Sequence, residues 1–365
     1  MKPISSIVVC ALMATSLYSA GHGDATSFIG PLNKIKGRAS TVPSNGDVNP
    51  YGVAVVPEES GDLHQGHVLV SNFNNSMNFQ GTGTTIVEIS PGDGSTKLFA
   101  HIDATKLPGP CPGGVGLTTA LVVLQSGWVI VGSLPTSDGM AATAKAGCLL
   151  VLNNKGAVVE TISSDEINGP WDMTALDKGT TASLFVTNVL NGTVAAGGGT
   201  VTMGTVLRID LSITGGKPPQ ETGRTIIGSG FPERTDPMAL VIGPTGVGLG
   251  ADGTLYVADT LGNRIAAISN AATLTSGGTV TTLIGGGGLT GPLGLAIAPN
   301  GNILTVNSGD GNMVETTPKG VQVTVKFVDL NGPPGAGDLF GLAIRANAAG
   351  VYFVNDGTNR LDLLH

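Results

Sequence analysis

Short apolar runs broken by Gly, Pro, Asn and Asp recur along almost the whole chain. In the clearest copy, residues 244–265, an apolar run follows Pro244 and Gly246, a tight turn follows at Asp252-Gly253, and a second run is rich in Leu, Tyr and Val. Apolar runs of about four to eight residues between such turn formers predict β-strands. Beyond the N-terminal stretch, no segment has a sustained apolar period of about 3.6 residues, so we expect few helices.

The pattern occurs six times. It returns at 292–313 and 339–361, an earlier copy covers 50–72, and two degenerate copies cover 117–132 and 170–188. Each copy continues into a third run, and a fourth run closes the first five units, at 96–99, 158–162, 224–227, 280–284 and 323–328. Four short strands per unit, at intervals of about 47 to 74 residues, are typical of propeller blades. The sequence therefore predicts an all-β fold, a six-bladed β-propeller of four-stranded antiparallel blades. Four blades plus a separate domain is the alternative.

The last unit has only three predicted strands, the third ending near His365. Its fourth strand has to come from elsewhere, because an open sheet edge invites pairing with other chains. The segment between Phe28 and Val42 belongs to no other unit. We therefore predict that an N-terminal strand closes the ring.

One run carries a resemblance to a known family. Tyr256-Val-Ala-Asp-Thr-Leu-Gly-Asn-Arg-Ile265, preceded by Pro244-Thr-Gly-Val, resembles an NHL repeat, and the copy at Pro292 is nearly as similar. The resemblance implies a propeller that is distantly similar to the gluconolactonase-like and strictosidine-synthase-like proteins. Such propellers include binding scaffolds and several kinds of enzyme, so the resemblance alone implies little about function.

The N-terminus indicates export. Residues 1–25 contain Lys2, an apolar stretch at 7–17 and small residues from Ser19 onward, which predicts a signal peptide ending near residue 25. We expect residues 26–365 to form one domain that is secreted or periplasmic. The apolar stretch is too short to span a bilayer, and a retained anchor is the alternative.

Two cysteines remain after the predicted cleavage, Cys111 and Cys148. An even pair in an exported chain predicts a disulfide, with two free thiols as the alternative. Cys111 lies in the loop that enters the inner strand of the second unit, and Cys148 opens the third strand of the same unit. Both positions belong to one face of one blade, so a bond is geometrically feasible.

Charge and composition narrow the possible partners. The chain of 365 residues has a net charge of -8, 12% charged residues and 41% hydrophobic residues. That hydrophobic fraction excludes a disordered chain, and the absence of any Lys/Arg block makes nucleic acid and anionic membranes poor partners. We expect a monomer that binds an unknown protein, glycan or small-molecule ligand, without membrane insertion after signal cleavage.

One face of the predicted ring is elaborated. The loops after the second strand are long in the first three units, at 72–84, 133–147 and 189–204, and short in the others. In propellers these loops share a face with the loops that enter the inner strands. Long loops on a rigid scaffold often carry function, so we predict a ligand-binding surface there, with neutral drift of the loops as the alternative.

Polar residues recur where the second strand ends. Five of the six units have a carboxamide or carboxylate at this position: Asn72, Asn188, Asp259, Asn307 and Asn355. The following residues include Ser133, Thr260, Ser308 and Asp356. These side chains either cap strand ends locally, or they converge on the channel as oxygen ligands for a polar ligand or a cation such as Ca²⁺. The metal hypothesis assigns Asn188, Asp259 and Asn307 as ligands.

Aromatic residues recur at the start of the inner strands. Tyr51, Trp171 and Phe340 occupy the middle position of the Pro-x-Gly pattern, in which Asp172 replaces the Gly of one copy and Leu339 replaces the Pro of another. Only 4% of the residues of the chain are aromatic. We predict that they line the pore mouth together with Asp172, and core packing is the alternative.

The resemblance to gluconolactonase-like enzymes implies a divalent cation held at the pore by carboxylates and asparagines. Asn188, Asp259 and either Asn72 or Asn307 would match such ligands. No Glu opens the first unit, where residues 49–52 read Asn-Pro-Tyr-Gly, so only one acid remains in the predicted set. His64, His67, His101 and His365 do not recur at pore positions, so we expect no zinc lyase site there. We therefore predict a non-catalytic binding or interaction scaffold, with a metal-dependent hydrolase or lactonase as the alternative.

Overall fold

The computed structural model describes residues 26–330 and 337–365, so the predicted signal peptide lies outside the described residues. Within these ranges the helices are two short 3-10 turns, η1 (Ala104–Lys106) and η2 (Ala141–Thr143). No helix in the described part of the chain has the length and apolar character needed to cross a membrane.

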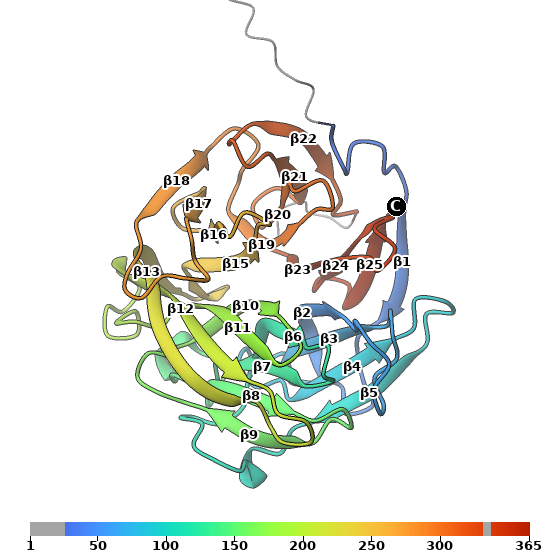
Figure 1. Ribbon diagram of the computed structural model, residues 1–365, viewed down its shortest axis with the longest axis vertical. Helices are drawn as coiled ribbons and strands as arrows, with labels where there is room; N and C mark the ends of the chain where they lie inside the picture. Colours follow the sequence, from blue (N-terminus) through green and yellow to red (C-terminus); the bar gives the residue numbers. More distant parts are fainter. Residues whose placement is uncertain (1–25, 331–336) are drawn as a thin grey trace, which may run out of the picture.

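Six antiparallel sheets are arranged as the blades of a ring (Figure 1). Blade one contains β2 (Val48–Val55), β3 (Val68–Asn74), β4 (Thr85–Ile89) and β5 (Thr96–His101). Blade two contains β6 (Leu117–Val123), β7 (Val129–Ser133), β8 (Cys148–Leu152) and β9 (Val158–Ile162). Blade three contains β10 (Pro170–Asp177), β11 (Thr181–Asn188), β12 (Val201–Ser212), β13 (Gln220–Asp236) and β14 (Leu240–Ile242).

The remaining blades have four strands each. Blade four contains β15 (Pro244–Leu249), β16 (Leu255–Asp259), β17 (Arg264–Ile268) and β18 (Val280–Gly285). Blade five contains β19 (Pro292–Ile297), β20 (Ile303–Asn307), β21 (Asn312–Thr316) and β22 (Gln322–Phe327). Blade six contains β23 (Leu339–Ile344), β24 (Val351–Asn355), β25 (Arg360–Leu364) and β1 (Ile35–Ser40). The six-bladed propeller expected from the repeats is confirmed.

Blade six closes the ring. Its outer strand β1 pairs antiparallel with β25, and Ile35 lies opposite Leu364 while Ser40 lies opposite Arg360 (Figure 1). The prediction that an N-terminal strand completes the last blade is therefore confirmed.

A buried glutamate holds the segment that precedes β1. Glu315 of β21 accepts hydrogen bonds from Phe28 N (2.7 Å), Ile29 N (2.9 Å) and Ser27 Oγ (2.6 Å). The side chains of Asn300 and Asn302 donate to the same carboxylate. Burial acts to raise the pKa of Glu315, but these hydrogen bonds outweigh it and keep the pKa below its usual value.

The middle strands of the blades are largely buried. Every residue of β3 and β4 is buried, whereas the outer strand β5 is partly exposed. Each blade packs between two others, so both faces of its middle strands meet apolar side chains. One apolar cluster, for example, joins Leu69 of blade one to Leu150 of blade two. This double burial explains why the strands read as continuous apolar runs and not as alternating ones.

The glycine of the repeated Pro-x-Gly lies where neighbouring inner strands approach each other. A side chain on Gly246, Gly294 or Gly341 would collide with a backbone carbonyl of the next blade, that of Leu293, Phe340 or Tyr51 respectively. These glycines are therefore required by close backbone approach around the channel.

Cys111 and Cys148 form a disulfide with a Cα–Cα distance of 5.0 Å. Cys148 begins β8, and Cys111 lies in the loop that leads to β6. The predicted pairing is confirmed, and the bond joins the loop before β6 to the start of β8 in blade two.

Candidate functional site

A cavity of about 910 Å³ lies at the end of the ring where the inner strands begin. Its lining comes from blades one, three, four, five and six. This is the face on which the loops after the second strands of blades one to three are long. The volume is in the range of small-molecule binding sites, which is roughly 300–1,000 Å³.

Stacked aromatic rings line one side of the cavity. The ring of Tyr51 lies between those of Phe73 and Phe340, with centroid distances of 4.4 and 3.8 Å. Trp171 lies 6.2 Å from Phe340, measured between ring centroids. All four side chains are buried, and burial followed by the charge of Asp356 raises the pKa of Tyr51 well above its usual value. Tyr51, Trp171 and Phe340 therefore form an apolar wall of the cavity, and Phe73, which the sequence analysis did not identify, stacks against Tyr51 without lining the cavity itself.

The polar lining consists mainly of hydroxyl and amide groups. Thr245 and Thr260 share a hydrogen bond of 2.6 Å between their hydroxyls, and the Ser308 hydroxyl donates to Gly291 O at 3.0 Å. Asp356 is the one acidic residue among the described lining residues, which include no Lys or Arg. Burial raises the pKa of Asp356 to about 8, and the nearby Asp338 carboxylate adds to the rise. Asp356 is therefore mostly protonated at neutral pH, and the cavity carries little charge.

The five predicted strand-end residues form hydrogen bonds with other groups of the protein. Their hydrogen bonds are Asn72 Nδ2 to Thr41 O, Asn168 N to Asn188 Oδ1, Gly262 N to Asp259 Oδ1, Asn307 Nδ2 to Gly288 O, and Thr358 N to Asn355 Oδ1. None of the five is among the described residues that line the cavity, although Thr260, Ser308 and Asp356, one position further on, are.

Asp259 is the only carboxylate in the predicted set of metal ligands. Its Oδ2 instead accepts from Arg264 Nε at 2.8 Å, and its Oδ1 accepts from Gly262 N at 2.9 Å. Burial raises the pKa of Asp259, and the ion pair with Arg264 opposes the rise. Both carboxylate oxygens are engaged, so these contacts do not fit a pore calcium site built on Asp259 with Asn188 and Asn307.

Asp172 lies deeper in the channel than Trp171. It lines a second cavity of about 400 Å³, formed by the inner strands of all six blades. Asp172 occupies the position that is glycine in the Pro-x-Gly of other blades, and its carboxylate accepts from Met173 N (2.8 Å) and Val247 N (3.2 Å). Burial raises the pKa of Asp172 to about 8. This carboxyl group therefore joins the inner strands of blades three and four.

An unexpected hairpin narrows the cavity. The turn at 237–239 between β13 and β14 contributes to the lining, together with Val241 and Ile242. Leu240 packs in the same apolar cluster as Tyr51 and Trp171, and it has a φ of +61°, a conformation that is strained for a bulky residue. Gln80 Nε2 donates to Met238 O at 3.2 Å, which joins the hairpin to the long loop of blade one.

Fold and cavity together define a six-bladed β-propeller with a ligand-sized central site. Solved structures with the same fold include regucalcin from Agrobacterium tumefaciens, a calcium-binding protein, at a TM-score of 0.56 and 14% identity, covering 90% of this chain and 93% of that one. A gluconolactonase from Xanthomonas campestris has a TM-score of 0.53 and 12% identity, with coverage of 91% and 97%. A catalytically inactive virginiamycin B lyase from Staphylococcus aureus, solved with quinupristin, has a TM-score of 0.51 and 17% identity, with coverage of 91% and 85%.

These likenesses establish the shared propeller architecture, including the similarity to gluconolactonase-like proteins expected from the repeats. No protein-family model matches the chain, and no curated protein matches its sequence. The resemblance of residues 256–265 to an NHL repeat therefore stays an interpretation of the sequence.

Proposed function

We propose that the protein is an exported binding protein that takes a small, neutral, hydroxyl-rich ligand, such as a sugar, in the cavity of about 910 Å³. The observation that carries this proposal is the combination of a stacked aromatic wall with a hydroxyl and amide lining. Aromatic rings present an apolar surface to the C–H groups of a sugar ring, and amides can both donate to and accept from its hydroxyls.

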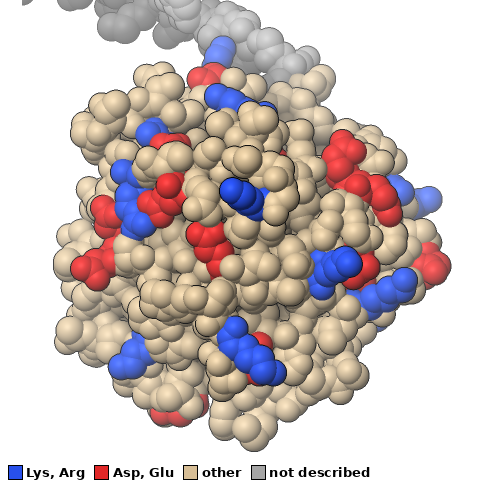
Figure 2. Space-filling view, turned by 60° about the horizontal axis from the view of Figure 1, so that its bottom comes forward, with Lys and Arg blue, Asp and Glu red and all other residues tan. Residues whose placement is uncertain are grey.

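The charge of the cavity favours a neutral ligand. A charged group that enters a partly buried site loses solvation and needs a charged partner to compensate. Asp356, mostly protonated at neutral pH, offers little such compensation, and the described lining offers no cationic side chain. On the face shown in Figure 2, acidic and basic side chains are interspersed, so that face has no large patch of a single charge.

Export is supported by two independent features. One is the Cys111–Cys148 disulfide, since disulfides persist mainly in oxidising compartments. The other is the signal peptide predicted from residues 1–25. We place the protein in the periplasm or outside the cell.

A metal-dependent lactonase is the competing function, because structural neighbours include a gluconolactonase. The engagement of Asp259 by Arg264 argues against a pore metal of the kind that we considered from the sequence. Hydrolysis of simple lactones and esters, with and without added divalent cations, tests it directly. Turnover above the uncatalysed rate would replace the binding hypothesis.

Binding can be followed through Trp171, because the chain has only two tryptophans. In Trp128→Phe, Trp171 is the sole tryptophan, and its fluorescence is expected to change as neutral mono- and disaccharides fill the cavity. Trp171→Phe keeps Trp128, in blade two, and serves as the control that should show no change. A panel without any saturable signal, checked by calorimetry on the unmodified protein, would contradict a sugar site.

A further inference from the structure

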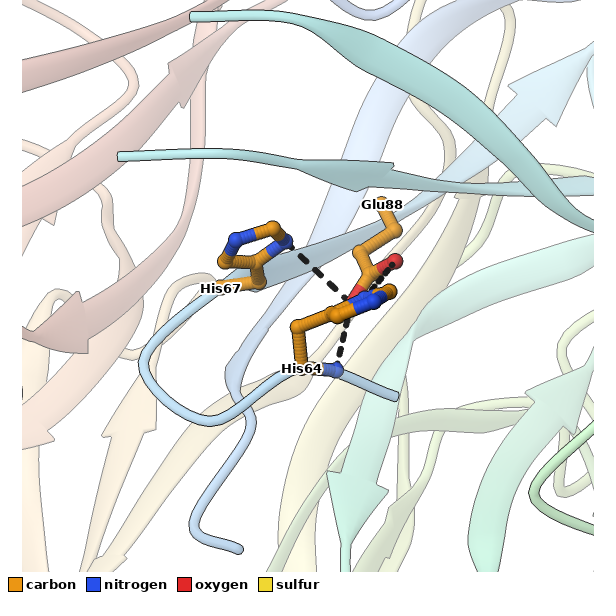
Figure 3. A group of neighbouring side chains, drawn as sticks. All are labelled: His64, His67 and Glu88. Atoms are coloured by element: carbon orange, nitrogen blue, oxygen red, sulfur yellow. Dashed lines mark hydrogen bonds and ion pairs between the residues drawn. The ribbon is translucent and has the colours of Figure 1, made fainter. Parts of the chain in front are cut away.

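Figure 3 shows a second group of chemically active side chains, which lies on blade one. His64 and His67 belong to the loop between β2 and β3, and Glu88 lies on β4. The cavity is lined by the beginning of β2, whereas this loop follows the end of β2. The group is therefore at the opposite end of the blade and takes no part in the proposed sugar site.

The three side chains converge. His64 Nδ1 lies 3.1 Å from Glu88 Oε2, and His67 Nδ1 lies 3.4 Å from Glu88 Oε1. One potential ligand atom from each residue lies within 4.8 Å of the other two. The Glu88 side chain is only 4% exposed, while those of His67 and His64 are 26% and 42% exposed. The arrangement is a buried carboxylate beneath two imidazoles that solvent can reach.

Local backbone structure holds this arrangement. His67 N donates to His64 O at 3.0 Å, which makes a turn and places the two rings side by side, with centroids 4.9 Å apart. His64 N donates to Glu88 Oε1 at 2.8 Å, which fixes the loop over β4. Glu88 itself is positioned by strand pairing, opposite Leu69 of β3. The site is thus largely formed before any ion enters.

We propose that His64, His67 and Glu88 bind a zinc ion. Zinc bonds to His nitrogen and Glu oxygen at about 2.0–2.2 Å, so neighbouring ligand atoms of a tetrahedral site are about 3.3–3.6 Å apart. Glu88 Oε1 lies 3.2 Å from His64 Nδ1 and 3.4 Å from His67 Nδ1, which is already close to that spacing. Two imidazoles and one carboxylate suit zinc, whereas calcium and magnesium prefer oxygen ligands alone. The exposed side of His64 leaves room for water as a fourth ligand.

Zinc in this site would also connect two blades. Asp62 N, in the same loop, donates to Asn154 O of blade two at 2.8 Å, and Asn154 Nδ2 donates to Ser60 Oγ at 3.0 Å. An ion that fixes the loop to β4 therefore stabilises the contact between blades one and two. An ion that binds only the folded chain raises its melting temperature.

The test uses the full chain after treatment with EDTA, titrated with zinc chloride in a calorimeter. We expect one zinc ion per chain and an increase in melting temperature, with no comparable response to calcium or magnesium. His64→Ala and His67→Ala should each weaken zinc binding by about 100-fold or more. Replacing a residue that only positions a metal ligand already weakens binding by about 10- to 100-fold, and losing the ligand itself should cost at least as much. His101→Ala, which removes an exposed histidine on β5, is the matched control and should bind zinc like the unmodified protein.

Glu88→Gln tests the third ligand, but Glu88 is buried and its replacement can disturb folding. Circular dichroism of each variant separates a folding defect from a binding defect, and the two histidine variants decide the proposal because their side chains are partly exposed. Cobalt(II) provides a second readout, since a tetrahedral site gives it visible absorption that should vanish in the histidine variants. Zinc binding that persists in the His64→Ala/His67→Ala double variant, that disappears in His101→Ala, or that is not stoichiometric would overturn the proposal. The His–Glu group would then be a hydrogen-bonded anchor for the loop.

Discussion

Replacing Glu315 by Gln should loosen the attachment of the N-terminal segment to blade five. The Glu315 carboxylate accepts hydrogen bonds from five donors. Two of these donors, Ser27 Oγ and Ile29 N, bind Oε2. A Gln side chain keeps one acceptor oxygen, and its amino group then faces the donors at the other position. We expect those hydrogen bonds to be lost while the rest of the blade stays folded.

The size of the effect follows from the contacts. A hydrogen bond to a charged group contributes about 1.5–3 kcal/mol, so losing the two at Oε2 should lower the free energy of unfolding by about 3–6 kcal/mol. The pKa of Glu315 is lowered in the folded protein, so its stabilising contribution is present at neutral pH. That contribution is lost as the pH falls through the folded-state pKa. The difference between the two proteins should therefore shrink in acid.

Urea denaturation at neutral and acidic pH measures this difference, and limited proteolysis shows whether residues 26–34 become accessible. Glu58→Gln is the control, because Glu58 is exposed and its contact with Gln65 is long, at 3.5 Å. Equal unfolding free energies for Glu315→Gln and the unmodified protein at neutral pH would refute the assigned role of Glu315. Unchanged proteolysis of the segment would do the same.

Three further predictions follow from the fold. Removing the disulfide in a Cys111→Ala/Cys148→Ala double variant should cost about 4 kcal/mol of unfolding free energy on the loop-entropy model for a sequence separation of 37, measured against the oxidised protein in urea. Burial raises the pKa of Asp172 to about 8 in the folded protein, whereas in the unfolded chain this carboxyl loses its proton above about pH 4. The free energy of unfolding should therefore fall as the pH rises from about 4 to about 8. Asp172→Asn should flatten the curve of melting temperature against pH, each such group contributing about 1.4 kcal/mol per pH unit. Deleting residues 26–42 should expose the edge of β25 and broaden the thermal transition, and a truncated protein that melts like the mature form would contradict the ring closure.

The blades could be predicted because short sequence patterns determine their strands and turns. Continuous apolar runs, glycines at close backbone approaches and turns such as Asp252-Gly253 are all written in the sequence, and Gly253 has the positive φ, +82°, that this turn needs. The extended β13 and the short β14 were not predicted. The sequence analysis assigned only residues 224–227 to that strand and left the region before Pro244 without an element, since its fold depends on packing against Tyr51 and Trp171.

The candidate site shows where repeat alignment stops being informative. The alignment locates the end of the second strand, but the turn that follows decides which of two adjacent side chains faces the channel. Asn307 therefore binds Gly288 O, while Ser308 lines the cavity. Asp259 was predicted to be a ligand because Arg264 was considered only as part of the NHL-like pattern. The ion pair that the Arg264 side chain forms with Asp259 was not considered.

The histidines were missed for a different reason. His64 and His67 are three positions apart, a spacing that is visible in the sequence, but Glu88 reaches them only through the pairing of β3 with β4. The sequence analysis also considered histidines only at pore positions. A search for His pairs near acids on neighbouring strands would have found the group.

Closing the ring through β1 has a consequence for the order of folding. Thr41 and Asn359 are 318 positions apart, yet they are joined by backbone and side-chain hydrogen bonds. During synthesis β1 is made before the strands β2 to β25, so almost the whole propeller must be made before its partner β25 exists. Contacts between such distant positions form slowly, because the cost in chain entropy precedes the gain. Until then the unpaired strand can pair with other chains, so folding yield should depend on protein concentration more than final stability does.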